Sequence, residues 1–446
     1  MPCSAEELYG WHERPGALER LAPPWERARV VARTGGIANG STVTLEVHAG
    51  PVAVRWVARH RDVVPGRQFV DEQVHGPFAS WVHLHRMIPV SADQCELEER
   101  IEFTPPFGPL GAAAVPHLRQ TCERLLAYRH RLLADDMAAA RELGLAPMHV
   151  VVTGASGLIG SAVVSLLGTG GHQISRLVRR PAAAPGEISW DPARGSIDSA
   201  ALEGVDAVVH LAGEGIAERR WSTARKQAIL TSRTEGTRLL ASALAGLARR
   251  PRVLISASAV GIYGDRRDEL LDESSEPGRD FLANVCQAWE AAADPARAAG
   301  IRVVHPRFGV VLSPGGGALA RLLPPFRAGV GGPIGGGSHW MSTIAIDDAA
   351  GAIQHILARE ALAGPVNVAG PEPVRNADFT RLLARILRRP AVVPVPAAAL
   401  RVLFGELADA ALLASQRVDP AALRRSGYVF RHRSLEDSLR FVLGRD

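Results

Sequence analysis

The chain has 446 residues, 47% hydrophobic side chains and a formal net charge of +5. This length suffices for two or three domains, and the composition suits globular packing rather than disorder. The basic residues are scattered, without a long block and without interleaved aromatic side chains, so no nucleic-acid partner is expected. The sequence shows no signal peptide and no long uncharged apolar run, which predicts a cytoplasmic protein without membrane insertion.

Residues 1–138 predict an α+β domain in which a sheet wraps around one long helix. Alternating apolar and polar residues predict strands over 41–47, 52–60, 68–73, 81–88 and 96–103. A broad leucine face predicts a helix over residues 115–139. Residues 139–147, which end in Gly144-Leu145-Ala146-Pro147, predict a short linker.

Residues 148–446 predict an α/β domain with a Rossmann-like, doubly wound parallel sheet. The candidate strands, which alternate with helical stretches, cover 149–153, 173–178, 207–211, 252–256, 302–305 and 365–368. Prolines at 390, 394 and 396 then introduce a small terminal cap over about 394–442, with a helix at 397–415.

A glycine-rich motif directly follows the first strand of this domain and opens its first helix. It reads Gly154-Ala155-Ser156-Gly157-Leu158-Ile159-Gly160. In this spacing Gly154 permits the tight turn, Gly157 lets backbone N–H groups approach a pyrophosphate, and Gly160 allows close helix packing. The helix N-terminus favours the phosphates. The motif predicts a dinucleotide-binding site, formed by Gly154, Ser156, Gly157, Leu158, Ile159 and Gly160.

The end of the second strand indicates which dinucleotide is bound. The sequence there reads Arg176-Leu177-Val178-Arg179-Arg180, with no acidic residue to bind a ribose 2′-hydroxyl. We therefore expect NADP(H) in preference to NAD(H), with the 2′-phosphate held by Arg179 or, as second choice, Arg180. The alternative is a basic strand end exposed to solvent.

Residues 148–446 resemble the extended, atypical short-chain dehydrogenase/reductase proteins, specifically the epimerase-like family that ends in a small C-terminal domain of unknown function. Besides the glycine-rich motif, the resemblance rests on Trp190-Asp191-Pro192, His210-Leu211-Ala212-Gly213-Glu214, Ser258-Ala259-Val260-Gly261-Ile262-Tyr263-Gly264, Trp289-Glu290-Ala291-Ala292, Leu323-Pro324-Pro325-Phe326-Arg327, Trp340-Met341-Ser342 and Asn367-Val368-Ala369-Gly370-Pro371.

The N-terminal part resembles the START-related ligand-binding domains called SRPBCC, through Trp11-His12-Glu13-Arg14-Pro15-Gly16-Ala17-Leu18, Pro23-Pro24-Trp25, Gly76-Pro77-Phe78 and Trp81-Val82-His83. Such domains usually open with a strand, whereas this sequence begins almost at the first helix. We expect either a start codon further upstream or a missing edge strand.

The resemblance implies further cofactor contacts. Leu211 and Ala212 would pass under the adenosine, Arg233 would contact a phosphate, and Arg307 would border the nicotinamide. Physical reasoning agrees for Leu211, Ala212 and Gly213, because small residues at the carboxyl end of a strand let a flat ligand lie close. For Arg233 the alternative is a salt bridge on the helix surface.

The catalytic residues are harder to assign, because the superfamily's tyrosine and lysine, four positions apart, are absent. The only lysine is Lys226, and the expected slots hold Leu282 and Cys286. Ser258 matches the superfamily's substrate-orienting serine, and Tyr263 is the candidate proton donor. Structural roles for Ser258 and Tyr263 stay open, and a nucleophilic Cys286 is not favoured.

The glycine-rich run 315–337 predicts a flexible lid above the nicotinamide, with Phe326, Arg327 and Trp340 as substrate-pocket residues. Plain loop packing is the alternative. No metal is expected: His83 and His85 share one face of a strand, but without further ligands a hydrogen-bonded or exposed pair is favoured. The four cysteines include no Cys-x-x-Cys pair, which fits a reducing compartment.

These observations predict an NADP(H)-dependent oxidoreductase or epimerase-like protein without the usual dyad, acting on a small hydrophobic or carbonyl substrate. The START-like domain would present or sequester a hydrophobic molecule. The alternative is a non-catalytic NADP(H) sensor or scaffold with a ligand-carrier domain. A sugar-nucleotide epimerase that works through the usual tyrosine is disfavoured by the single lysine.

Overall fold

The computed structural model describes residues 1–26, 28–49, 52–217 and 219–445. Two compact units are present. The first is Met1–Leu145 with Gly168–Gly171 and Leu443–Asp446, and the second is Ala146–Leu167 with His172–Val442. Across the described ranges, no helix combines the length and the apolar character needed to cross a membrane.

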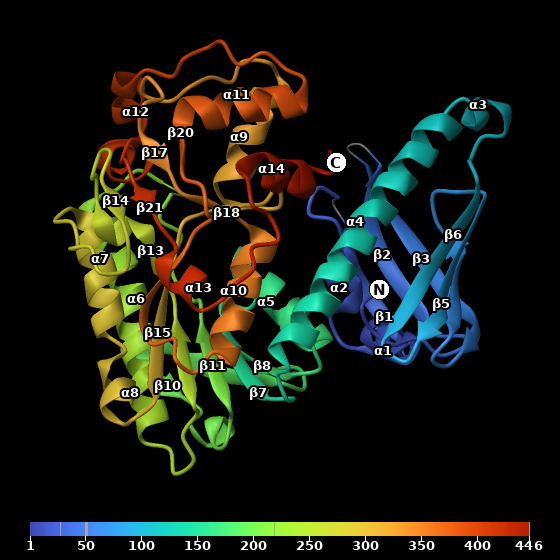
Figure 1. The fold of residues 1–446 in the computed structure, drawn as a ribbon, viewed down its shortest axis with the longest axis horizontal. Coiled ribbons are helices and arrows are strands. Elements are labelled where there is room, and N and C mark those ends of the chain that lie inside the picture. Colours follow the sequence, from blue (N-terminus) through green and yellow to red (C-terminus); the bar gives the residue numbers. More distant parts are fainter. Residues whose placement is uncertain (27, 50–51, 218, 446) are drawn as a thin grey trace. The chain divides into compact units, whose positions relative to one another are not determined.

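The first unit is a six-stranded antiparallel sheet with one long helix (Figure 1). Its strands pair in sequence order. Its elements are α1 (Ala5–Glu13), α2 (Ala17–Leu21), β1 (Ala28–Thr34), β2 (Thr42–Ala49), β3 (Val52–Val64), β4 (Gln68–His75), β5 (Ser80–Ser91), β6 (Gln94–Thr104), α3 (Pro109–Ala112) and α4 (Val115–Leu143). Strand β1 was not predicted, because it is exposed along most of its length and has no buried face.

Helix α4 continues through the first half of the predicted linker. Nothing in residues 139–143 breaks a helix, and α4 ends where Gly144 adopts a left-handed conformation with φ 56°. Leu132 and Leu133 on α4 are fully buried. The long helix thus supplies much of the core of this unit.

The second unit is a nine-stranded sheet with helices on its faces, as the sequence predicts. Its elements up to residue 387 are β7 (His149–Thr153), α5 (Leu158–Thr169), β8 (Gln173–Val178), β9 (Glu187–Asp191), β10 (Ser196–Ile197), β11 (Ala207–His210), α6 (Thr223–Ala245), β12 (Val253–Ser256), β13 (Ser258–Ala259), β14 (Leu270–Leu271), α7 (Phe281–Ala291), α8 (Asp294–Ala298), β15 (Arg302–Phe308), β16 (Val310–Leu312), α9 (Gly317–Arg327), β17 (Trp340–Met341), β18 (Thr343–Ala345), α10 (Ile346–Ala358), β19 (Gly364–Val368), β20 (Val374–Arg375) and α11 (Asn376–Leu387).

The strand order places a switch point between β7 and β11. The path runs β10-β9-β8-β7-β11-β12-β15-β13, and β19 also pairs with β15. From β7 the chain goes first to β8 on one side and later to β11 on the other. Ligands of doubly wound sheets bind in the crevice outside the carboxyl ends of the strands at such a point.

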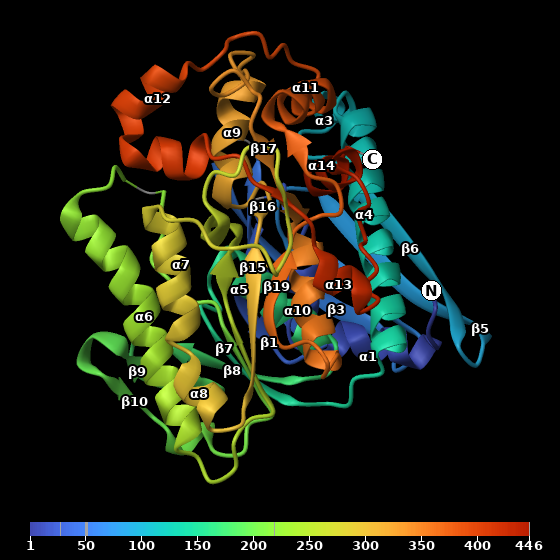
Figure 2. The same cartoon turned by 60° about the vertical axis from the view of Figure 1, so that its left-hand side comes forward.

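A buried apolar cluster joins one face of this sheet to its helices. Figure 2 shows α6 and α8 side by side along that face. Leu240 and Leu244 of α6 pack with Ala296 of α8 against Val208 and Leu254 of the sheet. These residues form a close-packed core between this face of the sheet and its helices.

The C-terminal segment is less regular than predicted. It forms α12 (Ala397–Phe404), a π-helical turn (Ala408–Leu412), β21 (Arg417–Val418), α13 (Ala421–Arg425) and α14 (Leu435–Leu443). The predicted helix 397–415 is interrupted after Phe404, where Gly405 has φ 61°. Strand β21 pairs in parallel with β14, so this segment is joined to the loop that follows β13.

Candidate functional site

The turn between β7 and α5 has the close packing that its glycines require. Gly154 adopts φ 65°, and a Cβ there would lie 2.8 Å from the Leu211 carbonyl group. A Cβ on Gly160 would lie 2.1 Å from the Gly154 carbonyl oxygen. Both glycines are therefore demanded by the fold itself.

Gly157 differs from the other two glycines of the motif. A Cβ there would meet only the Gly154 carbonyl oxygen, at 3.2 Å, and its φ is not positive. Ser156 and Gly157 are exposed, and α5 begins directly after them at Leu158. The N-terminus of α5 thus opens beside an exposed glycine, which is the geometry a pyrophosphate needs.

Thr153 joins the ends of β7 and β11. Its hydroxyl accepts hydrogen bonds from the Leu211 and Ala212 N–H groups, both at 3.1 Å, and contacts His210 Nδ1 at 2.7 Å. Burial lowers the pKa of His210 to about 4, so its ring is neutral and Nδ1 accepts the Thr153 proton. This network positions Leu211 and Ala212 beside the glycine-rich turn.

The two arginines at the end of β8 have different partners. Arg180 forms two hydrogen bonds with Glu187, at 2.8 and 2.5 Å. Arg179 is exposed and, among the described residues, its guanidinium makes no hydrogen bond. Arg225 mainly, with Arg179 and Arg233, lowers the pKa of Glu214 beyond β11. Arg179 is therefore the better placed of the two for a phosphate, although its predicted role stays a prediction.

Arg233 lies close to the end of β11 rather than in a salt bridge on the helix surface. Its guanidinium stacks on Trp289, 4.9 Å from the ring centroid, and donates to the Ile229 carbonyl oxygen at 3.2 Å. A Cβ on Gly213 would lie 3.4 Å from Arg233 Cζ. Gly213 and Arg233 are thus neighbours, as a shared role in cofactor binding requires.

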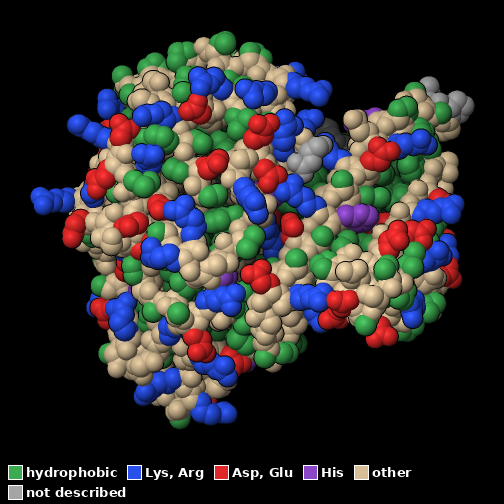
Figure 3. Space-filling model, viewed as in Figure 1, with side chains coloured by type: hydrophobic (Ala, Val, Ile, Leu, Met, Phe, Trp, Pro, Cys, Tyr) green, Lys and Arg blue, Asp and Glu red, His purple; other side chains and the backbone are tan. Residues whose placement is uncertain are grey.

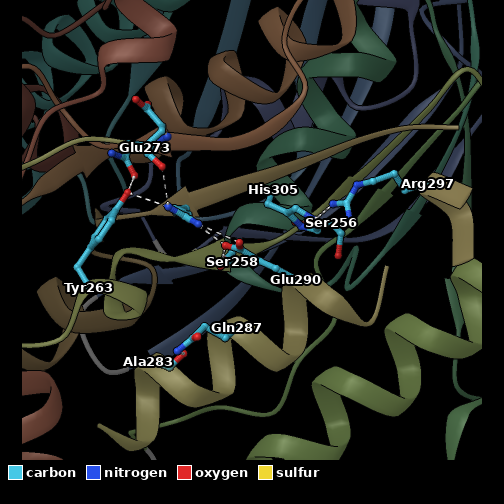
Figure 4. Close-up of polar contacts among 11 residues, drawn as sticks. Ser256, Ser258, Tyr263, Glu273, Ala283, Gln287, Glu290, Arg297 and His305 are labelled. Carbon is cyan, nitrogen blue, oxygen red and sulfur yellow. Dashed lines mark hydrogen bonds and ion pairs between the residues drawn. The ribbon is translucent and has the colours of Figure 1, made fainter. Parts of the chain in front are cut away.

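Ser258, the matched serine, belongs to a buried polar network that also contains Glu290 and Arg307. Ser258 Oγ donates to Glu290 Oε1 at 2.7 Å, and Arg307 donates to both Glu290 oxygens at 2.9 and 3.0 Å. Figure 4 shows Ser258 and Glu290 pointing toward each other. Burial alone would raise the pKa of Glu290, but Arg307 holds it below its usual value. Glu290 is therefore a carboxylate that accepts the Ser258 proton.

Tyr263, the candidate proton donor, is fully buried with its hydroxyl directed inward (Figure 4). The hydroxyl donates to Asn367 Oδ1 at 2.7 Å and accepts from Arg307 Nη1 at 3.1 Å. Burial raises the pKa of Tyr263. These bonds favour a structural role for Tyr263. The Arg307 guanidinium is engaged in the same network, and its expected contact with the nicotinamide stays a prediction.

The two positions where the superfamily has its tyrosine and lysine hold Leu282 and Cys286, which cannot replace them. Leu282 and Cys286 lie on α7 and are buried. Burial, with Glu290 nearby, raises the pKa of Cys286 to about 12, so its thiol is un-ionised and poorly nucleophilic at neutral pH. Glu290 follows Cys286 by one helical turn, and its role escaped sequence reasoning because only the fold brings it to Ser258.

The predicted lid contains a helix, α9, whose two internal prolines did not prevent it from forming. Phe326 is buried, whereas Arg327 on the same helix is exposed. Trp340 is half-buried between Arg375 and Arg417, whose guanidinium groups lie 4.6 and 4.8 Å from its ring centroid. The three predicted pocket residues therefore occupy different surroundings, and their shared role in a substrate pocket stays a prediction.

A surface cleft of about 500 Å³ lies beside the network, lined by residues 263–266 and 276–280. Neither Ser258 nor the glycine-rich turn lines it. The cleft therefore gives no direct evidence of where a substrate would meet the cofactor.

The switch point, the glycine-rich turn and the basic end of β8 define a dinucleotide-binding protein of the Rossmann class. Comparison with known protein families supports this class. Residues 150–370 match the NAD dependent epimerase/dehydratase family, residues 395–442 a domain of unknown function (DUF1731), and residues 1–128 the polyketide cyclase / dehydrase and lipid transport family.

Relatives extend over the whole second unit. An epimerase family protein of Mycobacterium tuberculosis, MT2273, is 45% identical over 298 residues, which are 66% of this chain and 98% of that protein. The human epimerase family protein SDR39U1 is 36% identical over 301 residues, which are 66% of this chain and 100% of that protein. The chain belongs to this epimerase family of NAD(P)-binding, short-chain dehydrogenase/reductase-like proteins, and it carries an SRPBCC domain at its N-terminus.

Solved structures show the same folds. A nucleoside-diphosphate sugar epimerase from Corynebacterium glutamicum aligns with a TM-score of 0.83 and 33% identity, covering 100% of this chain and 89% of that one. Human SDR39U1, crystallised with NADPH, aligns with a TM-score of 0.61 and 35% identity, covering 66% of this chain and 99% of that one. The START-like first unit and the Rossmann-like second unit are therefore both established.

Proposed function

We propose that the second unit binds NADP(H) in preference to NAD(H). The observation that carries this proposal is the end of β8, where Arg179 is exposed without a hydrogen bond among the described residues and the run 176–180 itself contains no acidic residue to bind a 2′-hydroxyl. The NADPH in the human relative's structure supports the same preference. Gly154, Ser156, Gly157, Leu158, Ile159 and Gly160 would hold the pyrophosphate.

A bound nicotinamide would supply hydride transfer, Ser258 would orient the substrate oxygen, and the proton that accompanies the hydride would be exchanged with solvent water. Ser258 already donates its hydrogen to the Glu290 carboxylate, so its oxygen lone pairs are left to accept from a substrate hydroxyl. Arg307 keeps Glu290 ionised and oriented. We propose Ser258 as the residue that meets the substrate, with Glu290 as its positioning partner, on a small carbonyl or alcohol substrate.

Sugar-nucleotide epimerisation through a tyrosine and lysine is not supported. The Corynebacterium relative is described as a nucleoside-diphosphate sugar epimerase. Here Lys226 forms an ion pair with Glu406 and lies over the Phe281 ring, 4.9 Å from its centroid. Its ammonium is held at the start of α6, away from the Ser258 network, so no lysine is available to lower a phenol pKa.

A second candidate is a non-catalytic NADP(H) sensor or scaffold whose first unit carries a hydrophobic ligand. The burial of Tyr263, with both of its hydrogen bonds made inside the protein, favours it. The match of the first unit to a family described as including lipid transport supports the carrier role.

Stopped-flow spectroscopy separates the two candidates. The NADPH-loaded protein is mixed with quinones, enones and aldehydes while absorbance of the reduced nicotinamide is followed. We expect decay with at least one of these substrate classes and slower decay in Ser258→Ala. A tightly bound NADPH that stays inert across the panel would replace the enzyme proposal with the sensor.

A further inference from the structure

The strands of the first unit bring five polar side chains from separate parts of the sequence to one face of the sheet. Cross-strand pairing places His60 of β3 opposite Asp71 of β4, Asp71 opposite His83 of β5, and His85 of β5 opposite Glu99 of β6. Because side chains alternate along a strand, His83 and His85 point to the same face. The neighbouring strands thus supply polar partners for these two histidines, which could not be found from the sequence alone.

Three of these residues are spaced as ligands of one metal ion. One ligand atom from each of Asp71, His83 and His85 lies within 4.8 Å of the other two. Asp71 Oδ2 and His85 Nε2 are 3.1 Å apart. Ligand atoms bonded to one tetrahedral zinc at about 2.0–2.1 Å are roughly 3.4 Å apart, so a small inward movement completes the site.

The surrounding groups are placed to orient these ligands. His60 Nε2 lies 2.9 Å from Asp71 Oδ1, the oxygen turned away from His85. Glu99 Oε1 lies 3.0 Å from His85 Nδ1, and Glu99 Oε2 lies 2.7 Å from His130 Nε2 of α4. Metal-binding histidines commonly present their second ring nitrogen to a carboxylate in this way, which fixes the tautomer.

The two histidines of the cluster are deeply buried. His83 and His85 are only 5% and 4% exposed. Glu99 Oε1 lies 3.1 Å from His83 Nε2 and 3.0 Å from His85 Nδ1, so one carboxylate oxygen faces both rings. Glu99 therefore fixes the orientation of both imidazoles on this face of the sheet.

The two carboxylates also make the cluster attractive to a cation. Asp71 and Glu99 face His60, His83, His85 and His130, and Arg129 of α4 interacts with both carboxylates. The Asp71 side chain is 26% exposed, which leaves a path for an ion to enter.

We infer that Asp71, His83 and His85 bind a divalent transition-metal ion inside the START-like unit. Two histidines and one carboxylate suit zinc, iron(II) or cobalt(II), and they leave coordination positions open for water or a ligand of this domain. His60 and Glu99 are positioning residues of the site.

Metal titration of the full chain tests this inference. Chelator-treated protein is titrated with Zn²⁺ by calorimetry and with Co²⁺ by visible absorption. We expect one ion per chain and a cobalt spectrum of low coordination number. Asp71→Asn and His85→Gln should each weaken binding by about 100-fold or more, and His60→Gln by about 10- to 100-fold. His75→Gln, at an exposed histidine on the same strand as Asp71, is the matched control and should bind as the unchanged protein does.

An unchanged circular dichroism spectrum and unchanged resistance of the first unit to proteolysis would show that each variant is folded, because NADPH binding reports only on the second unit. If a variant does not fold, histidine ¹⁵N NMR of the unchanged protein with and without Zn²⁺ replaces it, and His83 and His85 should shift while His75 does not. Absence of stoichiometric binding, or equal binding by Asp71→Asn and His75→Gln, would overturn the inference and leave a protonated His85 between two carboxylates. Burial alone would lower the pKa of His85, but the bonds with Asp71 and Glu99 raise it to about 9.

Discussion

Replacing Arg179 should change the cofactor preference of the protein more than its overall affinity for dinucleotides. This guanidinium is exposed and makes no hydrogen bond to a described residue; it acts on Glu214 only through its charge, so its removal breaks no hydrogen bond. A hydrogen bond to a charged group contributes about 1.5–3 kcal/mol. Arg179→Ala should therefore weaken NADPH binding by about 10- to 150-fold.

Arg179→Glu should have a larger effect, because it places a negative charge beside the 2′-phosphate. Two unit charges about 4 Å apart in water repel by about 1 kcal/mol, and the phosphate carries more than one. We expect a loss of at least about 100-fold for NADPH and a change of less than about threefold for NADH, which lacks this phosphate.

The assay is a fluorescence or calorimetric titration of each variant with NADPH and NADH at low salt and again at about 0.5 M salt, which should reduce the difference. Arg180→Gln is the matched control. Arg180 has the same charge on the neighbouring residue, but Glu187 already holds it. Equal losses for NADPH and NADH in Arg179→Glu, or a larger effect at Arg180, would refute the reasoning.

Three further predictions follow from the site. Gly157→Ala should weaken NADPH binding with little loss of Tm, and Gly157→Val should abolish binding. Gly160→Ala should instead lower Tm, because its Cβ would lie 2.1 Å from the Gly154 oxygen. Thermal scans and NADPH titrations measure these effects, and a large Tm loss in Gly157→Ala would contradict the reasoning. Tyr263→Phe should lower the free energy of unfolding by about 1–3 kcal/mol, because it leaves Asn367 Oδ1 unpaired, and it should leave kcat unchanged. A fall in kcat of about 100-fold would instead support Tyr263 as the proton donor. Glu290→Gln should destabilise the protein by about 3–5 kcal/mol, because it leaves the Arg307 charge buried without its partner. Since Arg307 holds the pKa of Glu290 below the usual 4.5, the stabilisation by this pair is present above that pH and is lost as pH falls through the folded-state pKa. Urea unfolding at several pH values should show that acid-side loss in the unchanged protein and a smaller one in Glu290→Gln; identical slopes would contradict it.

Local patterns sufficed to predict the parts of the fold that have strong periodicity. Strands β7 and β8 begin and end where the sequence predicted, because each is a short run rich in apolar residues next to a turn signal. Strand β1 was missed because it has no buried face, and β9 and β10 were missed because they are short strands at one edge of the sheet. The lid prediction missed α9, since its flanking glycines and internal prolines masked a helix with an apolar face.

The candidate site also contains parts that could be predicted from sequence and parts that could not. The glycine-rich turn is local in sequence, so its geometry could be predicted. Contacts between residues that are distant in sequence could not be predicted. Glu290 reaches Ser258 across 32 positions, and Asn367 reaches Tyr263 across 104. The same limit hid the Asp71, His83 and His85 cluster, because the strand register that joins these residues is not visible from spacing alone.

The charge pattern agrees with a small-molecule partner. On the face shown in Figure 3, basic side chains are interspersed with acidic and apolar ones rather than gathered in one patch. Nucleic-acid binding relies on a continuous basic surface, and nothing on this face favours it.

The central claim is most directly tested by calorimetric titration of the unchanged full-length protein with NADPH and, separately, with NADH under identical conditions. The account predicts that one NADPH binds per chain and that its Kd is at least about tenfold lower than that of NADH. Equal affinities, tighter binding of NADH, or no binding of either dinucleotide would contradict the assignment of the β7–α5 turn and Arg179 as an NADP(H) site.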